Sequence, residues 1–160
     1  MNNFTFGNAR YQYYETVAGG SGAGPGFDGA DVVQTHMTNS RLTDPEVLEW
    51  RFPVLLESFE VRSDSGGRGR WRGGNGGVRR VRFLEAMTAA ILSGHRRVRP
   101  HGMAGGEPGL AGRNWVERAC VGGHAGAVVE LGHSDRIEMN AGDVFVIESP
   151  GGGGYEVPSA

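Results

Sequence analysis

Glycine is the residue that most constrains the fold of this chain. It occupies 29 of the 160 positions, which is about 18 % where roughly 7 % is usual. The glycines follow no Gly-X-Y period, so a collagen triple helix is excluded. They cluster instead, for example at residues 19–26, 73–76 and 151–154. Because glycine adopts tight turns and tolerates close backbone approach, these clusters predict turns and close contacts between strands.

The sequence after Pro53 alternates between apolar and polar residues. Phe59 and Val61, for example, are separated and flanked by polar side chains, which is the pattern of a half-buried strand. Similar short segments, separated by glycine turns, lie at residues 78–83, 88–92, 115–120, 127–131, 136–139 and 144–148. This spacing predicts a mainly β fold, an antiparallel domain that resembles a sandwich or a barrel. Residues 140–143 are predicted to form a hairpin connection.

The N-terminal quarter of the chain has a different character. Residues 1–43 contain few large apolar side chains, and no period there predicts a long element. We therefore predict two regions: a glycine-rich arm and polar loop over residues 1–43, and a short helix followed by the β domain over residues 44–160. The backbone groups of the arm need hydrogen-bond partners, which a larger body or another subunit would supply.

The predicted helix begins at a four-residue capping pattern. Thr43 can cap it while Glu46 reaches back, or Asp44 can cap it with Pro45 at the first helical position. Pro53 limits its length.

Charge and composition exclude several classes of function. The net charge is −2, so no overall field attracts nucleic acid or an anionic membrane. All 16 cationic side chains are arginine, and without lysine the chain has no P-loop or Schiff-base lysine. The single cysteine, Cys120, excludes an internal disulfide and is expected to be a small core residue. No apolar run is long enough to span a membrane, and a cytoplasmic setting is expected.

Two further motifs are only weak evidence for a nucleotide or nucleic-acid site. Residues 24–29 match GxGxxG, but no clear strand precedes them and Pro25 removes a backbone donor, so we expect a glycine turn. Residues 68–74 resemble an RNA-binding segment rich in Arg and Gly. Arginines 79, 80 and 82 continue this segment into the strand predicted at residues 78–83. An outward-facing ladder of arginines on a sheet explains the segment better than a nucleic-acid site does.

Residues 36–46 form the most polar segment and follow directly on a glycine run. We predict a loop that faces a ligand. His36 can transfer a proton near neutral pH, Arg41 can hold a carboxylate or phosphate through two parallel hydrogen bonds, and Asp44 can orient either one. The simpler interpretation of Asp44 and Glu46 is a capped helix with acidic residues in its first turn. The residues predicted to contact substrate are Thr38, Asn39 and Glu46.

Glu15 is the fourth candidate catalytic residue. It is a single carboxylate among the aromatic residues Tyr13 and Tyr14, a setting that suits acid–base work. A buried, hydrogen-bonded structural role explains it equally well. The five histidines show no metal-binding spacing, so no metal ligand is predicted.

Several segments resemble one known family, in the same order along the chain. They are MNNFTFGN at residues 1–8, YYETVAGG at 13–20, HMTNSRLTDPE at 36–46, GGNG at 73–76, GGEPG at 105–109 and PGGGGY at 150–155. Together they resemble the C-terminal part of 5-oxoprolinases and of the hydantoinase B family. Members of that family are several times longer, so the resemblance implies a C-terminal segment that is inactive alone.

The resemblance also implies a chemistry. Such enzymes open a lactam or cyclic imide with ATP, which phosphorylates the ring carbonyl oxygen before water completes hydrolysis. ATP and a divalent metal are implied, bound outside this chain. The implied partner is the missing N-terminal part or a hydantoinase A-like ATP-binding subunit, in an oligomer. The alternatives are a non-catalytic β interaction module that docks a partner subunit, and a remnant of a longer gene.

Overall fold

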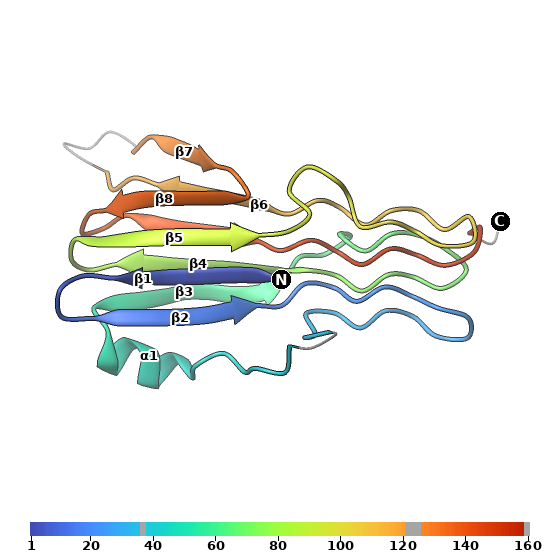
Figure 1. Cartoon of the computed structure of the whole chain (residues 1–160), viewed down its shortest axis with the longest axis horizontal. Helices are drawn as coiled ribbons and strands as arrows, with labels where there is room; N and C mark the ends of the chain where they lie inside the picture. Colours follow the sequence, from blue (N-terminus) through green and yellow to red (C-terminus); the bar gives the residue numbers. More distant parts are fainter. Residues whose placement is uncertain (36–37, 121–125, 159–160) are drawn as a thin grey trace.

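The computed structural model describes residues 1–35, 38–120 and 126–158. The elements are β1 (Asn2–Gly7), β2 (Gln12–Val17), α1 (Pro45–Arg51), β3 (Val54–Val61), β4 (Gly77–Phe83), β5 (Met87–Ser93), β6 (Arg113–Glu117), β7 (Val128–Leu131), β8 (Ser134–Met139) and β9 (Val144–Glu148). One sheet has the order β2-β1-β5-β8, and the other has the order β3-β4-β9-β6-β7. Both are antiparallel and pack as a sandwich (Figure 1), so the predicted mainly β fold with one short helix is confirmed.

The core fills the space between the two sheets. Phe4 of β1 stacks on Phe145 of β9, with ring centroids 4.6 Å apart, and Phe6 packs edge-on against Phe83 at 5.3 Å. Leu48 of α1 is completely buried and fixes the helix against this core. Removing such apolar side chains from water is the main force that holds the sheets together.

β1 and β2 lie within residues 1–43, where no strand was predicted. β1 alternates buried Asn2, Phe4 and Phe6 with more exposed residues, and it pairs with both β2 and β5. β1 and β2 form a local hairpin, and β5, from far along the chain, supplies the second neighbour of β1 and joins this segment to the common core. The domain boundary at residue 43 stays a prediction.

The turn at residues 140–143 was predicted to close a hairpin, and this prediction is wrong. β8 pairs with β5 in one sheet, whereas β9 pairs with β4 and β6 in the other. The turn therefore carries the chain from one layer to the next. Asp143, which is buried, holds it by accepting hydrogen bonds from the amides of Asn140 and Ala119, both at 2.8 Å. A local turn signal cannot show which strands will pair.

A second body extends from one end of the sandwich. It consists of long extended segments that are neither helix nor strand, at residues 18–33, 62–76, 94–112 and 149–158 (Figure 1). The last of these runs among the others. Its Gly151 and Gly154 donate N–H bonds to the carbonyls of Leu110 and Glu107, whereas Gly152 and Tyr155 donate to the segment at residues 71–74.

Gly151 and Gly154 thus face one neighbouring segment, and Gly152 and Tyr155 face another, three residues apart in each case, before Glu156 departs from this period by donating to Met103. Three residues per turn is the period of a polyproline II helix, which makes no internal hydrogen bonds and leaves its backbone free to bond sideways. We call the four segments the glycine bundle.

The bundle explains the glycine clusters. A Cβ atom on Gly152 would overlap the carbonyl of Ser21, and one on Gly153 would overlap the carbonyl of His101. On Gly154 it would overlap the carbonyl of Arg68. Consecutive glycines therefore face different neighbours, and none has room for a side chain. The predicted close backbone contacts exist, but they join extended bundle segments rather than strands.

We predict that Gly152→Ala destabilises the protein by about 3 kcal/mol, the upper end of the cost of overpacking, because backbone rather than a flexible side chain occupies the space. Gly94→Ala is the matched control, since nothing lies within 4 Å of its Cβ position. Urea denaturation of both variants measures the difference. Equal midpoints for the two variants would show that the bundle tolerates side chains.

Candidate functional site

The end of the predicted ligand loop is fixed by the start of α1. Asp44 is the N-cap, and its Oδ1 accepts a hydrogen bond from the amide of Glu46 at 3.0 Å, with Pro45 at the first helical position. Of the two capping patterns considered, the Asp44 pattern is the one formed. Glu46 is exposed in the first turn, where its negative charge interacts favourably with the helix dipole. Any part that Asp44 plays in catalysis stays a prediction.

Glu15 forms an ion pair with Arg79 in the interior. Arg79 Nε lies 2.6 Å from Oε1 of Glu15, and the terminal Nη2 lies 2.8 Å from Oε2. The two side chains are only 3 % and 1 % exposed. Arg79 was predicted to point outward together with Arg80 and Arg82. It points inward instead, because it lies on the buried face of β4, whereas Arg80 and Arg82 lie on the opposite, more exposed face. Two parallel charge-assisted bonds offset part of the cost of burying both charges.

Tyr13 connects this ion pair to the polar loop. Its hydroxyl donates to Oε2 of Glu15 at 2.8 Å and lies 3.1 Å from the hydroxyl of Thr43, the residue before the helix cap. Burial raises the pKa of Tyr13, partly opposed by the hydrogen bond with Thr43, so the phenol stays protonated. Arg79, Glu15, Tyr13 and Thr43 thus form a continuous polar chain from β4 to the loop.

A hollow of about 460 Å³ lies over this chain of groups. It is lined by the end of the loop and by β3 and β4, through Leu42, Thr43, Asp44, Pro45, Leu56, Phe59 and Arg79. The Arg79 guanidinium carbon lies 5.3 Å from the centre of the Phe59 ring, in a cation–π contact. Of the predicted residues, Asp44 lines this hollow, and Glu15 is connected to it through Arg79 and through Tyr13 and Thr43.

The start of the loop faces a different hollow. Thr38 is half-buried and lines a space of about 330 Å³ together with Gln34 and Thr35. The Gln34 side-chain amide donates to the Thr16 carbonyl at 2.7 Å, which fixes this stretch against β2. An adjoining hollow of about 320 Å³ shares Thr35 and is walled by residues of the glycine bundle.

The other predicted residues are less constrained. Asn39 and Arg41 are exposed, and Arg41 takes part in none of the ion pairs among the described residues. His36 lies outside the described residues. The structure therefore does not gather all predicted residues at one point: Thr38 lies at one hollow, and Asp44 at another.

Sequence reasoning missed Arg79, Tyr13 and Thr43. A signal for Arg79 was present, because it shares the phase of the apolar residues Val81 and Phe83 along one strand. An arginine in that phase points into the core and requires a buried carboxylate. Glu15, for which a buried structural role was one of the two interpretations, is that carboxylate.

The remaining reactive side chains are dispersed. Histidines 95, 101 and 133 are exposed, and the described residues contain no cluster of three or more His, Cys, Asp or Glu side chains that could hold a metal ion. Cys120, expected in the core, is exposed because β6 ends before it, at Glu117. No helix in the described ranges is long and apolar enough to cross a membrane.

Comparison with known proteins decides the family. The model of the family Hydantoinase B/oxoprolinase matches residues 1–158. The chain belongs to this family. It is 44 % identical to 5-oxoprolinase of Dictyostelium discoideum over 155 residues, which cover 97 % of the chain and 12 % of that protein. It is 46 % identical to 5-oxoprolinase of Saccharomyces cerevisiae over 173 residues, which cover 96 % of the chain and 13 % of that protein.

Two solved structures of larger proteins share the fold of this hydantoinase B-family chain. Nucleotide-free acetone carboxylase matches 98 % of the chain and 25 % of its own, with a TM-score of 0.73 and 17 % identity. The ATP-dependent caprolactamase of Pseudomonas jessenii matches 96 % of the chain and 28 % of its own, with a TM-score of 0.70 and 23 % identity. The chain therefore spans only a minor part of each relative.

We predict that Arg79→Met costs about 3–5 kcal/mol of unfolding free energy, because it leaves Glu15 buried without a partner. Glu15→Leu combined with Arg79→Met should recover much of this loss, since the variant then buries no unpaired charge. Thermal or urea unfolding of the wild type, the single variant and the double variant measures both effects. A double variant no more stable than Arg79→Met would contradict this account of the pair.

Proposed function

We propose that this chain acts as the C-terminal part of an ATP-dependent cyclic amide hydrolase of the 5-oxoprolinase and hydantoinase B type. The observation that carries the proposal is the match to 5-oxoprolinases at 44–46 % identity over nearly the whole chain. Since the chain spans about 12 % of the Dictyostelium protein, we propose that it is inactive alone. The natural substrate is a lactam, hydantoin or related cyclic amide.

The chain has no lysine for a P-loop, and its described residues include no cluster of three or more His, Cys, Asp or Glu side chains that could hold a metal ion. We therefore propose that ATP and a divalent metal bind to other parts of the enzyme, either an N-terminal region or a hydantoinase A-like subunit. An oligomer in the cytoplasm is the proposed setting.

The contribution proposed for this chain is its polar loop. Arg41 holds a carboxylate or phosphate of the ligand, Thr38 and Asn39 form hydrogen bonds with it, and Glu46 lies beside it at the start of the helix. His36 transfers a proton, and Asp44 orients His36 or Arg41. Glu15 serves this site through Tyr13 and Thr43, which hold the end of the loop in place.

A second candidate function is a non-catalytic scaffold that docks a partner subunit. The contacts of Asp44 and Glu15 favour it, because one caps α1 and the other neutralises Arg79. These roles require no substrate. The two candidates differ in whether changes in the loop alter turnover or only stability.

We predict that the purified chain alone does not release glutamate from 5-oxoproline and ATP. The reason is that the chain has no lysine for a P-loop and that its described residues include no cluster of side chains that could hold a metal ion. A coupled glutamate assay, with a mock purification as control, measures this. ATP-dependent glutamate release above the mock level would overturn the division of labour proposed here.

A second prediction concerns the loop in an assembled enzyme, such as Dictyostelium 5-oxoprolinase with this chain in place of its matching segment. Asp44→Asn should keep the cap, because Asn caps helices as well as Asp, and so preserve the melting temperature. It should lower turnover if the charge acts in catalysis. His36→Ala should lower turnover by about 10²–10⁴-fold, the contribution of a proton-transfer group. Normal turnover in both variants would leave only the scaffold candidate.

A further inference from the structure

The outer face of the four-stranded sheet is hollowed into a trough. Two hollows of about 590 and 730 Å³ lie on it and share Thr5, Tyr14, Ala90 and Arg136. These four residues form one row across the sheet, because Tyr14 pairs with Thr5, Thr5 with Ala90, and Ala90 with Arg136. The hollows are therefore parts of one feature.

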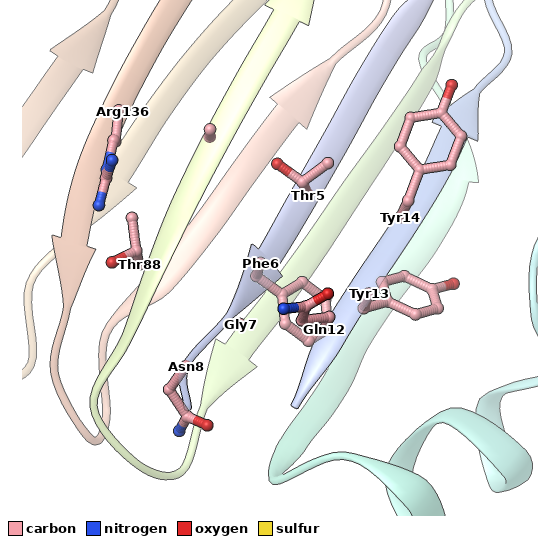
Figure 2. A pocket seen from close by; sticks show the side chains of 10 residues that line it. Thr5, Phe6, Gly7, Asn8, Gln12, Tyr13, Tyr14, Thr88 and Arg136 are labelled. Atoms are coloured by element: carbon pink, nitrogen blue, oxygen red, sulfur yellow. The ribbon is translucent and has the colours of Figure 1, made fainter. Parts of the chain in front are cut away.

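The shape of the trough follows from the size of its side chains. The middle strands, β1 and β5, present Thr5, Gly7 and Ala90, and these small residues make the floor, with Leu92 near one end of β5 as the exception. The outer strands, β2 and β8, present Tyr14 and Arg136, and these make the walls. Figure 2 shows Thr5 between Tyr14 on one side and Arg136 on the other.

The outer face of the five-stranded sheet provides a contrast. There Arg80 bonds to both carboxylate oxygens of Glu117 at 2.9 and 2.7 Å, and Glu57 contacts both Arg80 and Arg82. The hydrogen bond from Arg80 lowers the pKa of Glu117 to about 2. The charges on that face neutralise one another, as expected of a surface that meets water.

The trough carries a longer and more exposed ion pair. The Arg136 side chain is 74 % exposed, and its partner Glu138 lies 4.0 Å away and also accepts hydrogen bonds from Thr88. Tyr14 and Leu92 are 59 % and 58 % exposed on the same face. Exposed Tyr and Leu beside an arginine held only by a long ion pair are features of a protein interface.

We infer that the trough is a docking surface for an α-helix from the rest of a hydantoinase B-family protein. The relatives supply the polypeptide, since the match covers only 12–13 % of the 5-oxoprolinases. The inference rests on the proposed role as one part of a larger enzyme. The helix places small or apolar residues on Thr5 and Ala90 and a carboxylate against Arg136.

The dimensions of the trough favour a helix over other occupants. The backbones of β2 and β8 lie three strand spacings apart, about 14 Å, which is close to the width of about 10–12 Å of a helix with its side chains. One helix lying along the strands therefore covers the floor and contacts Tyr14 on one side and Arg136 on the other. A further sheet as wide as this one would rest on Tyr14 and Arg136 and leave the floor unfilled.

The test uses this chain and Dictyostelium 5-oxoprolinase produced without its matching segment. Sedimentation velocity should detect a complex, and Ala90→Arg should raise its Kd at least about tenfold by filling the floor. Val98→Arg is the control, because Val98 is 74 % exposed outside the trough. Melting temperatures confirm that both variants are folded, and Thr5→Arg replaces Ala90→Arg if the latter is not.

Hydroxyl-radical footprinting locates the contact. Tyr14 should be protected in the complex, while Trp50 of α1, 84 % exposed on a different element, serves as the internal reference. Absence of a complex, undiminished binding by the trough variant, or protection of Trp50 instead of Tyr14 would each overturn the inference. Protection of Tyr14 when the chain is alone would also overturn the inference, because it would indicate that a second copy of the chain occupies the trough. These experiments measure binding and not turnover. A failure of the proposed catalytic role alone therefore leaves their outcome unchanged.

Discussion

Contact between bare backbones in the glycine bundle is the constraint on which the structure depends. Residues 150–156 bond sideways to three other segments, and each of these begins or ends at a strand of the sandwich. Because glycine carries no side chain, neighbouring backbones approach closely enough for N–H and carbonyl groups to pair directly. The bundle thereby fixes the ends of the loops that connect strands within and between the sheets.

The ion pair of Glu15 and Arg79 fixes the two sheets of the sandwich to each other. It connects β2 to β4 across the two layers and reaches the polar loop through Tyr13 and Thr43. The loop is therefore fixed at its end by a buried charge pair and near its start by Gln34. Between these two points Asn39 and Arg41 remain exposed, which is the arrangement a ligand-contacting loop requires.

The sequence predicted most local features but not the sheet pairings. Alternation located β4, β5, β7, β8 and β9, and the proline after Asp44 located the helix start, whereas the local β1–β2 hairpin was missed. The pairing of β1 with β5, and of β9 with β4 and β6, depends on contacts distant in sequence, which no local pattern encodes. At the site, the cap at Asp44 could be predicted from the local sequence. The partner of Glu15 could be predicted only with the knowledge that Arg79 points inward. Whether the predicted residues act on a ligand stays a prediction.

The position of the last elements has a consequence for how the chain folds. β9 lies between β4 and β6, so the β6–β7 pair joins the rest of its sheet only through it. Residues 150–156 likewise supply shared partners for three earlier segments of the bundle. During synthesis these earlier segments must wait until residues 144–156 have emerged from the ribosome. Their unpaired edges are then exposed to aggregation, and folding is slowed by the distance in sequence between partners.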